Sequence, residues 1–131
     1  MTSVVYASLA TFLIVWLSLN VIKARHAKQI SLGDGGDPDL TKAIAAQANA
    51  IEYLPMAILL LLVLEYNGAP LVLVHTLGLL LLVGRLVHAN AILTNNLKTR
   101  VLGMQITIWI LIGLASANLL FLPYGKLVTP G

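Results

Sequence analysis

The sequence predicts an all-α membrane protein: a bundle of four transmembrane helices that forms a single domain over residues 1–131. Two observations predict this class. Of the 131 residues, 59% are hydrophobic and only 10% are charged, whereas a soluble domain carries about 25% charged residues. In addition, apolar runs at residues 4–22, 43–64, 71–92 and 101–122 each approach the ~20 residues with which a helix crosses ~30 Å of hydrocarbon.

The four runs are expected to be helices because a chain in lipid must satisfy all of its backbone hydrogen bonds internally. They are continuous and rich in leucine and alanine, and they lack the alternation of a membrane β-barrel. The first connection, residues 23–42, is long and polar, with glycine and aspartate concentrated at 33–39. The second is a tight turn at Asn67, Gly68 and Pro70, and the third, at 95–100, is short.

The basic residues predict the orientation. The first and third connections of a four-span protein lie on the same side of the membrane. They hold six of the eight lysines and arginines, against Lys126 alone on the other side and Arg85 inside a span. By the positive-inside rule these connections face the cytoplasm and both termini face the opposite side. The six basic residues are Lys23, Arg25, Lys28, Lys42, Lys98 and Arg100. Contacts with lipid headgroups would also explain the four lysines among them.

Two ionisable residues lie inside predicted spans: Glu52 in the second and Arg85 in the third. A charge at the centre of a bilayer costs roughly 2.5–3.5 kcal/mol on insertion scales. Such residues persist when they pair, line a wet cavity or bind a ligand. The simplest interpretation is a Glu52–Arg85 ion pair that holds the second and third helices together.

The neighbours of these two residues favour a binding site. Asn49 and Glu52 are spaced i, i+3, as are Arg85 and His88, so each pair shares a helix face. Arg25 ends the first helix and Arg100 begins the fourth, which places all these groups near the cytoplasmic end. Three arginines against one glutamate leave excess positive charge. The sequence therefore predicts a pocket for an anion, in which carboxylates or a thiolate would be stabilised.

Other chemistries are not supported. The chain has no cysteine, which excludes disulfides, thiolate metal sites and a protein thiol nucleophile. We expect no metal site, because His26, His75 and His88 are scattered and the aspartates at 34–39 lack the downstream glutamate of a calcium loop. No glycine-rich phosphate loop, Ser-His-Asp set or nucleic-acid-binding patch is present.

Five segments of the chain form a recognisable pattern. The most specific is the Asn-x-x-Glu-Tyr-x-Pro core that begins at Asn49, together with Arg85 in the third helix. The segments are residues 21–25 (VIKAR), 33–35 (GDG), 46–55 (AQANAIEYLP), 84–88 (GRLVH) and 100–103 (RVLG). Over nearly its full length the chain therefore resembles the MAPEG family, the membrane-associated proteins of eicosanoid and glutathione metabolism, and particularly its small bacterial members.

The resemblance implies a homotrimer in a bacterial inner membrane, with glutathione as co-substrate bound between protomers. It implies a glutathione transferase or peroxidase, whose lipophilic electrophilic substrate enters from the membrane lipids. Arg100 matches the arginine proposed to hold the glutathione thiolate. The residues that match positions contacting glutathione are Arg25, Gln47, Asn49, Glu52, Tyr53, Arg85 and His88.

Three positions depart from the family pattern. Ala45 stands where the family usually has an arginine, and the loss of such a charged hydrogen bond would weaken glutathione binding by about 1.5–3 kcal/mol. Ile92 and His88 replace tyrosines of the eicosanoid-producing members, which argues against eicosanoid synthesis.

Three functions remain open. The first is the glutathione transferase or peroxidase, and the second is a non-catalytic relative that binds a lipid or another anion, which Ala45 favours. The third is a small four-helix transporter with a proton-coupled membrane carboxylate. Such a transporter needs no surplus arginines, so Arg85 and Arg100 count against it.

Overall fold

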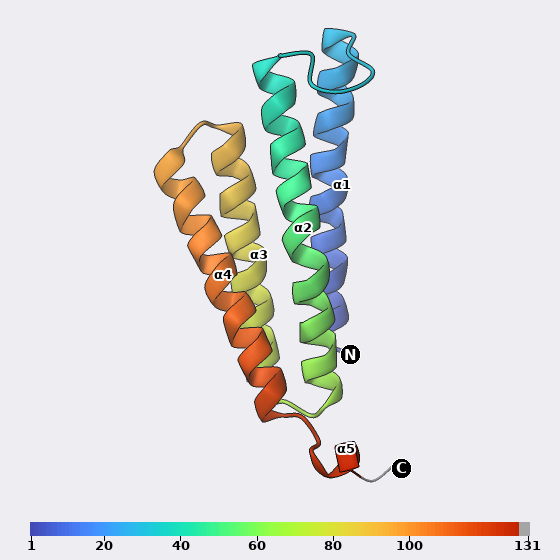
Figure 1. Ribbon diagram of the computed structural model, residues 1–131, viewed down its shortest axis with the longest axis vertical. Coiled ribbons are helices and arrows are strands. Elements are labelled where there is room, and N and C mark those ends of the chain that lie inside the picture. Colours follow the sequence, from blue (N-terminus) through green and yellow to red (C-terminus); the bar gives the residue numbers. More distant parts are fainter. Residues whose placement is uncertain (129–131) are drawn as a thin grey trace.

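The computed structural model describes residues 1–128 and confirms the four-helix membrane bundle (Figure 1). The long helices are α1 (Ser3–Lys28), α2 (Pro38–Tyr66), α3 (Leu71–Leu93) and α4 (Leu97–Leu120), followed by the single turn α5 (Gly125–Val128). Each of the four long helices is long and apolar enough to cross a membrane. The last three residues of the predicted domain, 129–131, lie outside the described part.

The helices are longer than the predicted spans at the end where the chain is polar. Helix α1 continues from residue 22 to Lys28, α2 begins at Pro38 rather than at residue 43, and α4 begins at Leu97 rather than at residue 101. Hydrophobicity marks only the part of a helix inside lipid, whereas backbone hydrogen bonding carries the helix on into water. At its other end α4 stops at Leu120, two residues before the predicted limit.

Local capping residues explain two of these starts. The Asp37 carboxylate accepts a hydrogen bond from the Leu40 backbone N–H at 2.9 Å, and Pro38 occupies the first turn, so α2 begins there. The Asn96 side chain accepts from the Thr99 N–H and starts α4.

Helix α1 begins without a local side-chain cap and uses a residue of α2 instead. The Glu65 carboxylate accepts hydrogen bonds from the backbone N–H groups of Thr2 and Ser3, each at 2.5 Å. A carboxylate at the N-terminus of a helix also complements the helix dipole. Glu65 therefore fixes the N-terminus of α1 to the C-terminal end of α2.

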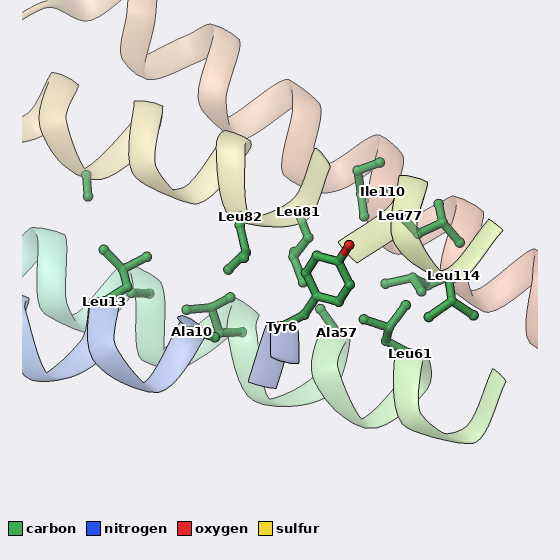
Figure 2. Packing of buried hydrophobic residues seen from close by; sticks show 14 of the residues in the cluster. Tyr6, Ala10, Leu13, Ala57, Leu61, Leu77, Leu81, Leu82, Ile110 and Leu114 are labelled. Atoms are coloured by element: carbon green, nitrogen blue, oxygen red, sulfur yellow. The ribbon is translucent and has the colours of Figure 1, made fainter. Parts of the chain in front are cut away.

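The core is a seam of leucine and alanine along the inner faces of the four helices. Figure 2 shows Leu13 and Ala10 of α1 facing Leu82 of α3, and Leu61 of α2 near Leu77 and Leu114. Tyr6 lies within this core and its hydroxyl contacts His75 Nδ1 at 2.6 Å, which places His75 at the end of the bundle where the termini lie.

Glycine allows α3 and α4 to approach closely. A Cβ atom on Gly103 would lie 2.7 Å from the backbone nitrogen of His88, and one on Gly84 would lie 2.8 Å from Ile106 Cγ2. Real Cβ atoms do not make contacts of this length. The approach brings Arg85 and His88 of α3 against the first half of α4.

Large apolar side chains cover the outer surface of all four helices. Phe12 of α1 and Trp109 of α4, for example, are 69% and 70% exposed. A soluble monomer rarely exposes so much continuous apolar surface. In a bilayer these side chains contact lipid or another protomer, which fits the membrane class.

The α1–α2 and α3–α4 connections lie at one end of the bundle, and the N-terminus and α5 lie at the other (Figure 1). This is the pairing of connections that the predicted topology requires. Helices α1 and α2 also extend further than the α3–α4 turn at this end, which leaves a step beside α2. The end of the bundle that holds the α1–α2 and α3–α4 connections is called the basic end below.

Candidate functional site

Arg85 is the centre of a buried polar cluster between α2, α3 and α4. It is only 2% exposed, and all three of its guanidinium nitrogens donate hydrogen bonds. Nη1 donates to Asn49 Oδ1 at 2.5 Å, Nε to Thr107 Oγ1 at 3.0 Å, and Nη2 to Met104 Sδ at 3.6 Å. Its Cζ atom also lies 5.3 Å from the centre of the Tyr53 ring.

These contacts explain how the bundle tolerates a buried guanidinium. Placing an arginine at the centre of a transmembrane helix costs roughly 2.5–3.5 kcal/mol on insertion scales. A hydrogen bond to a charged group contributes about 1.5–3 kcal/mol, and a desolvated cation–π contact about 2 kcal/mol. Asn49, Thr107 and Tyr53 together therefore offset the insertion cost without any carboxylate.

The Glu52–Arg85 ion pair, the simplest interpretation of the two charges, does not form within the described chain. Within residues 1–128, Glu52 has no ion pair or hydrogen bond, and its side chain is exposed on the outside of the protomer. Asn49 and Glu52 are three positions apart, so at 3.6 residues per turn their side chains point in directions about 60° apart around the helix. Asn49 points its amide into the bundle towards Arg85, and Glu52 therefore lies just outside the buried face.

Glu52 lies deep in its helix. It is 14 residues after Pro38 and 14 residues before Tyr66, the two ends of α2. At 1.5 Å per residue it is about 21 Å from either end. A charged carboxylate at this depth with no partner among residues 1–128 is costly, and a ligand, a trapped water or a second protomer would lower that cost.

Two of the predicted ligand-binding residues lie on the α1–α2 side. The Gln47 amide donates to Ser18 Oγ at 2.9 Å. Arg25 Nη1 donates to the carbonyl oxygens of Gly33 at 2.7 Å and Ile30 at 3.4 Å, and so holds the α1–α2 connection. Arg25 also lines a concavity of about 350 Å³ near the end of α1.

The α1–α2 connection is itself organised by two carboxylates. Hydrogen bonds from the Gly36 N–H and the Thr41 hydroxyl lower the pKa of Asp34 below its ordinary value. The Leu40 N–H lowers the pKa of Asp37, and Lys28 Nζ lies 3.4 Å from the Asp37 carboxylate. Both aspartates therefore stay ionised and structured close to Arg25.

Arg100 lies apart from this group, at the step beside α2. It lines a concavity of about 420 Å³ together with Lys42 and Ala45 of α2 and the α3–α4 turn at Asn95 and Asn96. Within residues 1–128 neither Lys42 nor Arg100 forms an ion pair or a hydrogen bond through its side chain. This is a strongly cationic concavity.

The predicted site residues thus fall into separate groups within one protomer. Asn49, Tyr53 and Arg85 meet inside the bundle, and His88, 3% exposed, is buried against Gly103 one turn further along α3. Arg25 and Gln47 lie on the α1–α2 side, and Arg100 and Glu52 are exposed. The single pocket expected at this level is not formed by one copy of the chain.

Sequence reasoning missed Thr107 and Met104, which contact Arg85. Thr107 is fully buried, and its hydroxyl donates to the Gly103 carbonyl at 2.9 Å while it accepts from Arg85. The sequence did contain a signal, because Thr107 lies two helical turns after Arg100 and is, with Gln105, one of two polar residues in the first half of the apolar run. A threonine can satisfy its own hydroxyl within a helix, and this made the residue uninformative in isolation.

The fold and the site define a class: a four-helix membrane protein with a buried Arg–Asn–Tyr cluster, a membrane carboxylate with no partner in the described part of the chain, and further arginines at one end. A profile of the MAPEG family matches residues 3–120. The chain belongs to the MAPEG family, as its motifs indicated.

Named relatives place such chains in a membrane. The chain is 38% identical over 124 residues to the inner membrane protein YecN of Escherichia coli strain K12, with 95% of each chain covered. The same identity and coverage hold for inner membrane protein YecN of Escherichia coli O6:H1. The names of these relatives state a location and no activity.

Proposed function

We propose that the protein binds glutathione between Glu52, in the middle of α2, and the arginines at the basic end of the bundle, and uses it as a transferase or peroxidase towards lipophilic electrophiles. The observation that carries the proposal is Glu52, an exposed carboxylate in the middle of a transmembrane helix that has no ion pair or hydrogen bond among residues 1–128. The ammonium group of glutathione would supply that partner.

The remaining charges also suit glutathione, which has two carboxylates and a thiol. Arg25 and Arg100 each line an open concavity near the same end. Each guanidinium nitrogen of Arg85 already donates a hydrogen bond within its own protomer, so its role is to hold Asn49 and Tyr53 in place while adding positive potential. Charge therefore matches the tripeptide, although the groups lie on different sides of one protomer.

A homotrimer in an inner membrane would bring these groups together. In such an assembly the α1–α2 side of one protomer, with Arg25 and Gln47, would face the Glu52 side of the next. Glutathione would then bind between them, with the site open to the cytoplasm and both termini on the opposite side. The exposed apolar faces of the helices support an assembly or lipid contact around the whole bundle.

The chemistry asked of the protein is electrostatic. Glutathione supplies a thiol, whose proton passes to water. In the transferase reaction, its thiolate sulfur bonds to an electrophilic carbon of the substrate while a leaving anion departs. In the peroxidase reaction, it bonds to the terminal oxygen of a hydroperoxide while the O–O bond breaks and an alcohol leaves, and a second glutathione then converts the sulfenic acid to the disulfide and water. Arg100 would stabilise the thiolate as a fixed positive charge and would not accept a proton. An apolar substrate concentrates in the bilayer, and the apolar side chains around the bundle would let it approach from there.

Binding can be tested with the detergent-solubilised protein. Millimolar glutathione should raise the melting temperature, and Glu52→Gln and Arg85→Ala should each abolish the rise. Glu52→Gln is the cleaner variant, because the residue is exposed and the change keeps its shape. Lys126→Gln, at the opposite end, is the matched control, and no rise in the unmodified protein at millimolar glutathione would refute the proposal.

Catalysis needs its own test. With a lipophilic electrophile, Arg100→Gln should lower kcat by about 10²–10³-fold, the usual effect of removing one preorganised charge-stabilising donor. The midpoint of the rate against pH should lie below ~8.5, the ordinary value of a free thiol, and should move up towards it in Arg100→Gln. Thermal stabilisation without turnover would favour the second candidate, a non-catalytic anion-binding protein.

One observation favours that second candidate. The Arg85 guanidinium lines none of the concavities described above, because Asn49, Thr107 and Met104 already occupy its nitrogens. Lys42 and Arg100, in contrast, are free to bind an anion without any chemistry.

A further inference from the structure

The cationic concavity beside α2 is followed along α4 by an apolar groove. The groove is lined by Val101, Met104, Gln105, Ile108, Trp109 and Ile112 and has a volume of about 360 Å³. The concavity and the groove lie on one face of α4, because their residues form two neighbouring rows spaced by four. One row is Leu97, Val101, Gln105 and Trp109, and the other is Arg100, Met104, Ile108 and Ile112.

In each row the first residue lines the cationic concavity and the others line the groove. The arrangement therefore changes from charged to apolar along a single helix, starting at the basic end. Trp109 lies nine residues after Arg100, about 14 Å along the helix axis. That distance is within reach of the acyl chain of a lipid whose phosphate is at Arg100.

The charges in the concavity are not neutralised. Lys42 and Arg100 have no side-chain partner within residues 1–128, and no acidic residue is among those that line the concavity. Of the lining residues, Thr41 donates a hydrogen bond to the Asp34 carboxylate at 3.2 Å, on the side of the α1–α2 connection. The amide of Asn95 adds a neutral hydrogen-bond donor.

From this juxtaposition we propose that the concavity and the groove form a binding site for one anionic phospholipid. Its phosphate binds between Lys42 and Arg100, and one acyl chain lies in the groove from Val101 to Ile112. Basic pockets between transmembrane helices at the membrane surface suit anionic headgroups. Ala45 leaves room for the headgroup because its side chain is a single methyl.

A second groove on the same molecule serves as a comparison. Leu9, Phe12, Leu13, Trp16, Leu82 and Leu86 line an apolar groove of about 340 Å³ between α1 and α3, with no charged residue among them. Lipid chains can contact this groove as well, but nothing in it selects an anionic headgroup. Each groove contains one of the two tryptophans of the chain, Trp16 or Trp109.

The experiment uses these tryptophans as reporters, in nanodiscs and without glutathione. The variant Trp16→Phe retains Trp109, and Trp109→Phe retains Trp16. Phosphatidylglycerol with brominated chains is titrated into a phosphatidylcholine background, and brominated phosphatidylcholine is titrated in parallel. We compare the mole fraction of each brominated lipid at which Trp109 fluorescence is half-quenched. This mole fraction should be about 5-fold or more lower for phosphatidylglycerol than for phosphatidylcholine, because each cation contributes roughly a 5-fold preference for an anionic lipid.

Variants locate the headgroup. Lys42→Gln should reduce the preference for phosphatidylglycerol at Trp109 about 5-fold, and Ala45→Leu should reduce it without changing any charge. Lys98→Gln removes a lysine at the same end that does not line the concavity, and it should leave the preference intact. Trp16 should report no preference.

Three results would overturn the lipid site. They are equal quenching of Trp109 by the two lipids, the same preference at Trp16, or a loss in Lys98→Gln as large as that in Lys42→Gln. The lipid site would also be overturned if inorganic phosphate, at the same concentration as phosphatidylglycerol, displaced that lipid fully from the site. The acyl chain would then contribute nothing to binding. The lipid phosphate and a glutathione thiolate would compete for Arg100, so these titrations contain no glutathione. The lipid site is judged by Trp109 quenching, and the proposed function by the glutathione-dependent melting temperature and by turnover, so failure of one is distinguished from failure of the other.

Discussion

The close approach of α3 and α4 at Gly103 gives a prediction with a matched control. In Gly103→Ala the added methyl carbon would lie 2.7 Å from the His88 backbone nitrogen and 2.8 Å from its Cα and Cβ. These atoms belong to the α3 backbone or are bound directly to it, so no side-chain rotation relieves the contact. The helices must move apart.

The required movement sets the magnitude. Non-bonded carbon atoms are comfortable at about 3.5–4.0 Å, so α3 and α4 would have to separate locally by at least about 0.7 Å. Overpacking of this kind costs about 1–3 kcal/mol. The higher helix propensity of alanine offsets up to about 1 kcal/mol of this cost.

Gly113→Ala isolates the packing contribution. Gly113 is on the same helix, but the nearest atom to its added methyl would be Leu77 Cδ2 at 3.6 Å, an ordinary contact. Both variants gain the same propensity, so the free energy of unfolding of Gly103→Ala should fall below that of Gly113→Ala by about 1–3 kcal/mol.

The assay is reversible unfolding of the detergent-solubilised protein in a denaturing detergent, followed by circular dichroism. Thr107 connects this packing to the site, because its hydroxyl bonds both to the Gly103 carbonyl and to Arg85 Nε. Gly103→Ala should therefore also weaken any ligand binding that depends on the Arg85 cluster. Equal unfolding free energies for the two glycine variants would falsify this account of the helix contact.

Three further predictions follow from the polar contacts. Asn49→Ala removes the 2.5 Å acceptor of the buried Arg85 guanidinium and should lower the free energy of unfolding by about 1.5–3 kcal/mol in the same assay; a smaller loss would mean that another group replaces the amide. Because folding lowers the pKa of Asp37, its cap is fully formed above the unfolded value of about 4 and is lost as pH falls through the folded value. Hydrogen exchange at the Leu40 amide, corrected for intrinsic rates, should therefore accelerate at acidic pH, and Asp37→Asn, which keeps an acceptor, should remove this acceleration. Glu65→Gln should increase exchange at the first amides of α1, and unchanged exchange would show that the carboxylate does not hold that end.

Most of the fold could be predicted from hydrophobicity. The four apolar runs located the helices because a membrane span must be apolar over its whole length. Their ends could not be located in this way, since Lys28, Pro38 and Leu97 lie in polar sequence where caps decide the boundary. Asp37 and Asn96 are recognisable capping residues, and these could have corrected two of the starts.

The site was predicted less completely. Arg85 and Asn49 stood out because polar groups inside a span are costly, and the structure joins them directly. The partner assigned to Arg85 was wrong, because opposite charge suggested Glu52 while the direction of each side chain around α2 selected Asn49. Thr107 went unnoticed because its hydroxyl is explained equally well within its own helix.

The sequence by itself determined the class, the number of spans and the residues that cost too much to be incidental. These follow from the free energy of placing each residue type in lipid, which is a local property. Only the tertiary structure decided the partners: Asn49 and Thr107 on Arg85, Glu52 left unpaired, and Lys42 brought beside Arg100 at the head of an apolar groove. Partners depend on the rotation of each helix about its axis and on how closely the helices approach. At the α3–α4 contact that approach is set by Gly84 and Gly103, across residues distant in the chain.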